Sequence, residues 1–389
     1  MPADVLSSRE REAVLRLRSI LAETGYDTRE VGTRLGAPDP ELSEAEMRSL
    51  WQWRARHSDP LSVLLRLFFL GDPVDARALR RFGDDNLKDW QRQRWIFPDG
   101  ARWKAAIELS LHGALVIACD RQDRQDRPHR HFVAGPTRAT GVLADALLPN
   151  RGDSALDLGT GTGILALRFS EKLQHRVATD INPRALRFAA WNALLNGQDG
   201  IELLPSDGYN AVGTRRFHQI AGNLPFVITP RQRYSFRETG VPGDAFLSRT
   251  IRETTPHLAE GGVAQFLGQW IHRDGEGENE RLASMLSGTG LDALFLRTRI
   301  EAADAHAARW LAGPESLDAG ERLRRMRGWV SALHALGVQA VSTGLIVLRR
   351  RKAKQHFLVV DEAAERELTG KRLERRLDAL DRALTRSRG

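Results

Sequence analysis

The sequence predicts an α/β protein in which an open, mostly parallel β-sheet follows a helical N-terminal region. From Thr137 onward, short apolar runs alternate with helix-like segments, the order that builds a parallel sheet. The stretch Ala155–Leu167, ALDLGTGTGILAL, predicts a buried strand, a glycine-rich turn and a helix. The first hundred residues carry helix caps and amphipathic runs instead, which predicts a separate helical domain.

The composition supports a globular protein with three parts. The 389 residues are 41% hydrophobic and 28% charged, enough to bury a sizeable core. We expect a helical, winged-helix-like domain over 1–131, a sheet domain over 132–350 and a basic, helical tail over 351–389. The sequence has no long uncharged apolar window, so no membrane span is expected. It has no apolar run near its start, so no secretory signal is expected.

The cysteine content predicts the cellular compartment, and the charge distribution predicts which segment could contact nucleic acid. The one cysteine, Cys119, cannot form an internal disulfide and lies in an apolar run, so an inert core thiol in a cytoplasmic protein is expected. The net charge is +8, and residues 320–389 hold 17 lysines and arginines against 8 acids. The basic character therefore belongs to the C-terminal segment, which is the part expected to contact nucleic acid if the protein does so.

The N-terminal elements are predicted from caps and apolar periodicity. Helix starts are expected at Ser7 with Glu10 and Ser43 with Glu46, as capping boxes, and at Asp59–Pro60. Two strands, Arg102–Leu111 and Ala114–Cys119, are expected to form a hairpin. Helices followed by a hairpin are typical of a winged-helix module, which can read DNA or shape a substrate cleft. The polar stretch Asp120–His131 is expected to be a linker, and its histidines lack the neighbours of a metal site.

The sheet domain is predicted strand by strand. Seven strands are expected, at Ala155–Leu158, Arg176–Thr179, Ile201–Leu204, His218–Ala221, Gly262–Trp270, Ala293–Ile300 and Gln339–Arg349. The last should pair antiparallel beside the sixth. Helices are expected at Thr137–Leu148, Pro183–Asn196, Gly243–Leu258 and Arg281–Ser287, with a helical insertion over 301–336 and a solvated helix over Glu362–Thr385.

The glycine turn predicts a ligand that lies close to the backbone. Gly159, Gly161 and Gly163 follow Asp157, a carboxylate at the end of an apolar run that needs a partner. A dinucleotide fingerprint would place its third glycine at 164, where Ile164 stands. Further along, Asp180 ends the second strand, where a carboxylate can accept two adjacent ribose hydroxyls or cap the next helix.

These motifs resemble those of the class I S-adenosylmethionine (SAM) methyltransferases. The resemblance implies a Rossmann-like, seven-stranded methyltransferase sheet over about 132–350, with SAM as cofactor. It assigns cofactor binding to Asp157, Gly159, Thr160, Gly161, Gly163, Asp180, Ile181, Asp207 and Asn223. The Ser206-Asp207-Gly208 turn would contact adenine in this pattern, although an isolated Asp-Gly is usually only a turn.

Asn223-Leu224-Pro225-Phe226 resembles the (N/D)-P-P-(F/Y) motif of enzymes that methylate nitrogen conjugated to a π system. The Asn223 oxygen and the carbonyl at 224 can each accept one N–H, and Phe226 can stack on a planar substrate, so we expect these four residues to be catalytic. Leu224 replaces the family's first proline. Pro225 still biases Leu224 toward extended geometry, so the acceptor pair should persist.

The sequence does not decide between several classes of methyl acceptor. The resemblance is closest to the release-factor glutamine methyltransferase group, which implies a protein glutamine. A nucleobase amino group and a small-molecule nitrogen fit the same motif, and a nucleic-acid-binding protein with a vestigial methyltransferase core is a fourth reading. The basic, aromatic loop at Arg231, Arg233 and Tyr234 is expected to face the substrate or solvent. Oligomeric state is not predicted.

Overall fold

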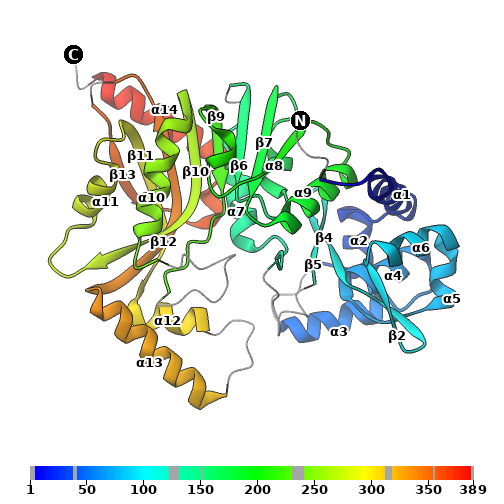
Figure 1. The fold of residues 1–389 in the computed structure, drawn as a ribbon. Coiled ribbons are helices and arrows are strands. Elements are labelled where there is room, and N and C mark those ends of the chain that lie inside the picture. The colour runs from blue at the N-terminus through cyan, green and yellow to red at the C-terminus, as the bar shows by residue number, and fades with distance from the viewer. Residues whose placement is uncertain are drawn as a thin grey trace. The chain divides into compact units, whose positions relative to one another are not determined.

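The computed structural model describes residues 5–37, 42–121, 131–149, 152–229, 241–311, 318–353 and 355–386. The chain forms two compact units (Figure 1). The helical unit comprises Met1–Pro136, Gly161–Ile164 and Asn182–Asp199, and the sheet unit comprises Thr137–Thr160, Leu165–Ile181 and Gly200–Gly389. The predicted domain boundaries at 131 and 350 stay predictions. No helix in the described ranges is long and apolar enough to cross a membrane.

In the described residues of the helical unit, eight helical segments surround a hydrophobic core. They are α1 (Ser8–Thr24), α2 (Thr28–Leu35), α3 (Glu44–Arg54), α4 (Pro60–Leu64) with its π-helical continuation η1 (Leu65–Leu70), α5 (Ala76–Leu79), η2 (Arg80–Phe82) and α6 (Asp84–Arg92). The later helix α9 (Pro183–Leu195) joins the same core. Leu64, Leu65, Leu67 and Phe68 are completely buried, so the apolar helix starting at Pro60 lies in the centre of this core.

The strands of the helical unit differ from the predicted hairpin. Arg102–Ala105 (β3) pairs with β1 (Val74–Asp75) and β2 (Ile96–Asp99), whereas Ile107–His112 (β4) pairs with β5 (Leu115–Asp120). The predicted single strand is broken at Ala106, whose N–H donates to the Trp95 carbonyl at 2.7 Å. The hairpin is therefore shorter than expected, and the winged-helix interpretation stays a prediction.

Two predicted capping boxes have different outcomes. Ser43 and Glu46 exchange both bonds, so that box is confirmed. Ser7 caps the Glu10 N–H, but the buried Glu10 carboxylate accepts from Trp191 Nε1 at 2.7 Å and from Arg187. The second half of the Ser7 box is wrong because a long-range ion pair takes the carboxylate.

The sheet unit contains eight strands in the order β13-β11-β12-β10-β9-β6-β7-β8. They are β6 (Ser154–Leu158), β7 (His175–Asp180), β8 (Ile201–Pro205), β9 (Phe217–Gly222), β10 (Leu258–Arg273), β11 (Leu291–Ala302), β12 (Val338–Arg350) and β13 (Leu358–Glu362). The strands β6 to β10 pair in parallel, and β12 pairs antiparallel with both β10 and β11. All seven predicted strands are present, and the Rossmann-like class is confirmed.

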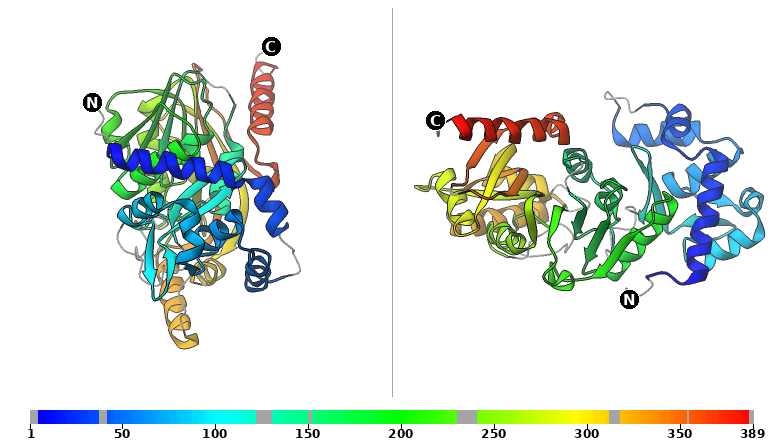
Figure 2. Two further views of the ribbon diagram at one scale, coloured as in Figure 1. Left: turned by 90° about the vertical axis from the view of Figure 1, so that its right-hand side faces the viewer. Right: turned by 90° about the horizontal axis from the view of Figure 1, so that it is seen from above.

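The eighth strand and the helices complete this unit. β13 comes from the tail and pairs in parallel with β11, which the sequence did not predict. The helices are α7 (Arg138–Ala146), α8 (Ile164–Arg168, at the unit boundary), α10 (Ala245–Thr254), α11 (Glu278–Leu286), α12 (Ala303–Leu311), α13 (Ala319–Ala335) and α14 (Gly370–Arg386). The helices α12 and α13 form the predicted insertion. Figure 2 shows α14, in red, alongside the strands of the sheet unit.

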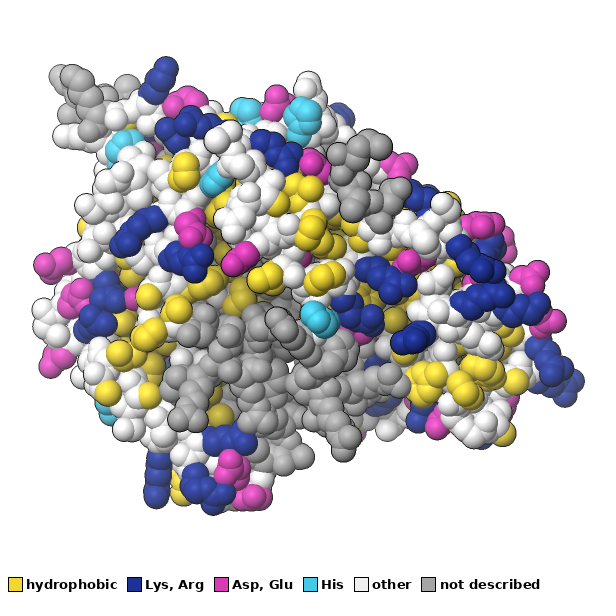
Figure 3. All heavy atoms as spheres, viewed as in Figure 1, with side chains coloured by type: hydrophobic (Ala, Val, Ile, Leu, Met, Phe, Trp, Pro, Cys, Tyr) yellow, Lys and Arg dark blue, Asp and Glu magenta, His cyan; other side chains and the backbone are white. Residues whose placement is uncertain are grey.

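The basic C-terminal segment is largely tied into the fold. Arg349 is 6% exposed and pairs with Asp292 at 3.0 Å and with Asp381 of α14 at 2.6 Å. Arg351 pairs with the same Asp292 at 2.7 Å. These arginines neutralise buried or neighbouring carboxylates, so less of the segment's charge is available to a partner than the sequence implies. On the face in Figure 3, acidic and basic side chains are interspersed over the sheet unit.

Candidate active site

The glycine turn after β6 has the backbone geometry that requires glycine. Gly159, Gly161 and Gly163 all have left-handed φ angles, of 69°, 55° and 84°. A Cβ on Gly159 would lie 2.9 Å from Leu224 Cδ2, and one on Gly163 would lie 3.0 Å from Ala189 Cβ of α9. Side chains at these positions would therefore clash as well as strain the turn.

Asp157 stands completely buried under this turn. Its Oδ2 accepts from the Thr160 hydroxyl at 2.6 Å and from the Ala166 N–H at 3.0 Å. Its Oδ1 is buried and has no hydrogen-bond partner among the described residues. Burial, helped by the nearby charge of Asp180 and opposed by these hydrogen bonds, raises the pKa of the Asp157 carboxyl to about 7. Oδ2 of Asp157 thus stabilises the turn, whereas Oδ1 can accept a hydrogen bond from a ligand or pair with a cation.

The loops after β7 and β8 join the glycine turn at the carboxyl edge of the sheet. The Thr160 N–H donates to the Thr179 carbonyl at 2.8 Å, and the Ser206 N–H donates to the Asp180 carbonyl at 3.0 Å. Ile181 follows Asp180 and is 71% exposed, unusual for a large apolar side chain. The structure thus places Asp157, Gly159, Thr160, Asp180, Ile181 and Asp207 on neighbouring loops of one edge, where ligands of open α/β sheets bind.

Asn223 begins the loop after β9, and the NH2 group of its side-chain amide is already hydrogen-bonded. Its Nδ2 donates to the Thr140 hydroxyl of α7 at 2.9 Å. Its Oδ1 is buried and has no partner among the described residues. A buried, unsatisfied carbonyl costs free energy unless a ligand donor fills it. The Thr140 contact fixes which end of the amide is the acceptor, as catalysis by Asn223 would need.

The rest of the motif packs closely around the turn. Leu224 is half-buried and lies against Gly159 and against Gly222, where a Cβ would come within 3.3 Å of Leu224 Cγ. Phe226 is half-buried, and its ring meets Trp310 edge to face at a centroid distance of 6.5 Å. Leu224 and Phe226 line one small apolar cavity of about 20 Å³ with residues of α10 and β10.

Three residues that sequence reasoning missed support this loop. The buried Gln269 of β10 accepts the Ile228 N–H at 3.0 Å. The buried His306 of α12 contacts the Ile228 carbonyl through Nε2 at 3.0 Å, and Trp310 lies one turn further along the same helix. Burial lowers the pKa of His306, which favours a neutral ring whose Nε2–H donates to that carbonyl. The His306–Trp310 spacing was visible in the sequence, but nothing there linked it to the motif.

Some predicted residues receive no structural test. Arg231, Arg233 and Tyr234 lie outside the described residues, as does His129. Within the ranges that the structure describes, no group of three or more His, Cys, Asp or Glu side chains could hold a metal ion. Cys119 is buried, and burial together with nearby acids raises the pKa of its thiol well above the ordinary value, as expected for an inert thiol.

Part of the chain is similar in sequence to known methyltransferases. Residues 134–266 match the family model of the methyltransferase small domain. A release factor glutamine methyltransferase of Xylella fastidiosa is 29% identical over 190 residues, 48% of this chain and 53% of that protein. One of Cereibacter sphaeroides is 34% identical over 127 residues, 32% of this chain and 41% of that protein. A ribosomal protein L11 methyltransferase of Bradyrhizobium diazoefficiens is 45% identical over 64 residues, 16% of this chain and 22% of that protein.

The family model matches the part of the chain that carries the glycine turn, Asp180, Asp207 and Asn223. This chain spans about half the length, or less, of these relatives. The predicted resemblance to class I, release-factor-type methyltransferases is confirmed for this region, and with it the prediction of SAM as the family's methyl donor. Residues 134–266 are therefore similar to the methyltransferase small domain family.

Proposed function

We propose that the protein is a SAM-dependent N-methyltransferase whose acceptor is a planar amide nitrogen, the side chain of a glutamine in a protein. The observation that carries this proposal is the buried Oδ1 of Asn223, which has no hydrogen-bond partner among the described residues while Thr140 holds the other end of the amide. The names of two relatives, release factor glutamine methyltransferases, support the glutamine acceptor, and the name of the third supports a protein acceptor.

The residues at the sheet edge suit SAM. The free Asp157 oxygen and the open backbone of the glycine turn would hold its amino-acid end, and Asp180 would accept the ribose hydroxyls. The exposed Ile181 would cover one face of the adenine, with Asp207 at its edge. When bound, SAM supplies an electrophilic methyl group on a sulfonium centre.

The chain's own contribution to the reaction is positioning. An amide nitrogen is a poor nucleophile because its lone pair is delocalised into the carbonyl. Acceptance of one N–H by Asn223 Oδ1 and of the other by the Leu224 carbonyl would hold the nitrogen with its lone pair toward the methyl group. Phe226 would stack on the amide plane, and its π face favours developing positive charge. Once the nitrogen has gained the methyl group it is strongly acidic and loses one proton to water, so this arrangement needs no strong general base.

The test compares Asn223→Ala with the wild type and with Asn210→Ala, an exposed asparagine of the same unit. Calorimetry measures SAM affinity, and transfer of labelled methyl groups from SAM to ribosomal and release-factor fractions measures turnover. We expect Asn223→Ala to reduce turnover by about 100-fold or more while the Kd for SAM stays within about threefold. Hydrolysis of the labelled protein should release N5-methylglutamine.

Two results would contradict the proposal. If Asn223→Ala abolishes SAM binding and leaves turnover per bound cofactor unchanged, Asn223 has a structural role. If the label enters RNA or small molecules and not protein, the protein-glutamine acceptor is wrong although the methyltransferase assignment stands.

A further inference from the structure

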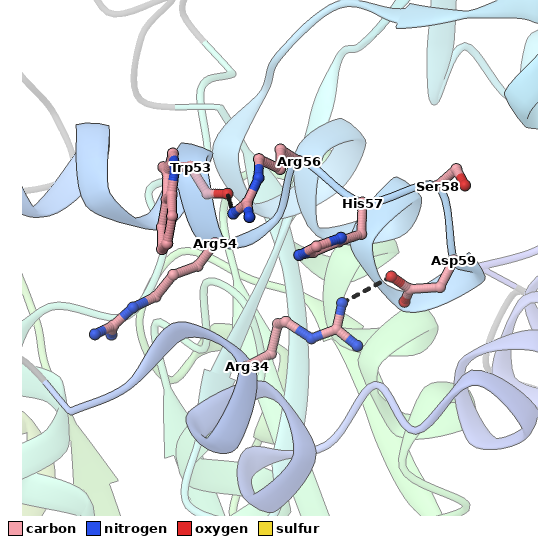
Figure 4. Close-up of a pocket in the computed structure, with 7 residues that line it drawn as sticks. All are labelled: Arg34, Trp53, Arg54, Arg56, His57, Ser58 and Asp59. Atoms are coloured by element: carbon pink, nitrogen blue, oxygen red, sulfur yellow. Dashed lines mark hydrogen bonds and ion pairs between the residues drawn. The ribbon is translucent and has the colours of Figure 1, made fainter.

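A surface hollow of the helical unit has not been given a role by the methyltransferase assignment. It has a volume of about 640 Å³ and lies around the loop that joins α3 to α4 (Figure 4). We call it the arginine hollow; it is lined by Arg34, Trp53, Arg54, Arg56, His57, Ser58 and Asp59. It lies entirely within the helical unit.

Most of the positive charge in this hollow is not neutralised by acids. Arg54 donates to the Leu35 carbonyl, and Arg56 donates to the Trp53 carbonyl at 2.7 Å. A backbone carbonyl positions a guanidinium without cancelling its charge. Among the described residues of the hollow, only Arg34 pairs with a carboxylate, Asp59, at 2.7 Å.

Two further arginines contact the same loop in the same way. Arg66 of η1 donates to the His57 carbonyl at 3.4 Å, and Arg81 of η2 donates to the Ser58 carbonyl. Both arginines are held by backbone carbonyls, which do not cancel their charge. The guanidinium groups of Arg34, Arg66 and Arg81 therefore contact the loop 55–59, whose one carboxylate is Asp59. Arg54 directly precedes this loop, Arg56 lies within it, and both line the hollow with Arg34. Fixed, planar guanidinium groups with free N–H donors match the oxygens of phosphate.

An aromatic side chain lies among these cations. Trp53 is 60% exposed, more than any other large apolar side chain among the described residues of the helical unit. The Arg56 guanidinium carbon lies 4.0 Å from the centre of the indole ring, a cation–π contact that holds the ring in place (Figure 4). Burial does not explain an exposed indole held by an arginine, whereas stacking on a planar ligand would.

We propose that the arginine hollow binds single-stranded nucleic acid, with phosphates on the arginines and one base stacked on Trp53. Cationic grooves with an exposed aromatic ring bind single strands in this way, and every base offers a face to stack. A duplex keeps its bases stacked on each other and would leave Trp53 unused. An acidic peptide would occupy the arginines but would not need the indole.

The test measures the binding of an oligouridylate of about 12 nucleotides, labelled with fluorescein, by fluorescence anisotropy. The competitors are the same strand paired with its complement and a polyglutamate of similar charge. The full chain is used, first alone and then with SAM. We expect the single strand to bind at least tenfold more tightly than the duplex or polyglutamate, with an affinity that falls steeply as salt increases.

Substitutions distinguish the contribution of the Trp53 ring to binding from that of the arginine charge. Trp53→Ala should weaken oligouridylate binding about tenfold or more, and Trp53→Phe should recover part of that loss because it keeps a stacking ring. Arg56→Gln should weaken binding and lower the slope of log K against log salt by about 0.7, one phosphate contact. Arg11→Gln, the same charge change on the exposed face of α1, is the control and should change little. Thermal unfolding checks that each variant folds.

Three outcomes would overturn the proposal. The first is equal binding of duplex and single strand. The second is unchanged affinity in Trp53→Ala, with polyglutamate competing as well as RNA, which would indicate a charged surface with no role for the ring. The third is an equal loss in Arg11→Gln and Arg56→Gln. Each outcome is independent of methyl transfer, so the proposed function is tested separately.

Discussion

Asp157 connects cofactor binding to pH. Its carboxyl is completely buried with a pKa raised to about 7, so much of it is protonated in the free protein at neutral pH. A protonated carboxyl cannot form an ion pair with the ammonium group of SAM. We therefore expect the Kd for SAM to decrease as pH rises from about 6 to about 8, and Asp157→Asn to remove this dependence. Calorimetry of both proteins across this range also corrects for titration of SAM itself.

The same shift predicts how stability changes with pH. A carboxyl whose pKa is raised on folding binds a proton more tightly in the folded state. Its contribution to the free energy of unfolding is therefore fully present below the ordinary pKa of 3.8 and is lost as pH rises through about 7. Thermal melts of the cofactor-free wild type should fall over this range relative to those of Asp157→Asn. Identical pH profiles for the two proteins would contradict the raised pKa.

Leu224, the departure from the family's motif, is a residue-scale test of which atoms matter. Its backbone carbonyl is the proposed acceptor, whereas its side chain packs on Gly159 and Gly222. Leu224→Pro keeps the carbonyl and removes part of that packing. We expect turnover within about threefold of the wild type and a melting temperature lower by a few degrees. A loss of turnover of about 100-fold or more would mean that the leucine side chain contacts the acceptor.

At the scale of elements, α12 supports the loop that carries the motif. His306 contacts the Ile228 carbonyl, and Trp310 contacts Phe226 edge to face. Neither contact involves the glycine turn. The insertion is therefore expected to control the acceptor and not the cofactor.

His306→Ala should raise the KM for the acceptor by about tenfold and leave the Kd for SAM nearly unchanged. His306→Gln keeps an N–H donor near the Ile228 carbonyl and should restore part of the loss. His334→Ala, an exposed histidine of α13, is the matched control. Parallel losses in acceptor and SAM binding would instead indicate general destabilisation of the sheet unit.

A helix or strand was predictable from the sequence where residues close together in the chain determine it. The seven strands and the helix after Asn182 follow from apolar runs and caps within a few residues of one another. The break at Ala106, the ion pair of Glu10 and the strand β13 all depend on partners distant in sequence. For the same reason the motifs located the candidate site, whereas Thr140, Gln269 and His306 emerged only from contacts across 41 to 83 positions.

At the scale of the whole molecule, the tail has a role that its composition concealed. Its charge suggested a solvated helix, but Leu373 and Leu377 of α14 are buried, and Asp381 pairs with Arg349. The Arg349–Asp292 pair is buried, so loss of either partner would leave an uncompensated charge inside the fold. The tail is therefore part of the folded sheet unit.

The strand β13 covers what would otherwise be an open edge of the sheet. It pairs with Ala293–Arg297 of β11, and Ala293, Leu294 and Phe295 are completely buried. A chain ending at Arg350 would present these unpaired N–H and C=O groups and apolar side chains to other molecules. We expect that truncation to aggregate in light-scattering measurements at concentrations where a chain ending at Arg386 stays monodisperse. The tail would thus prevent self-association through the edge of the sheet.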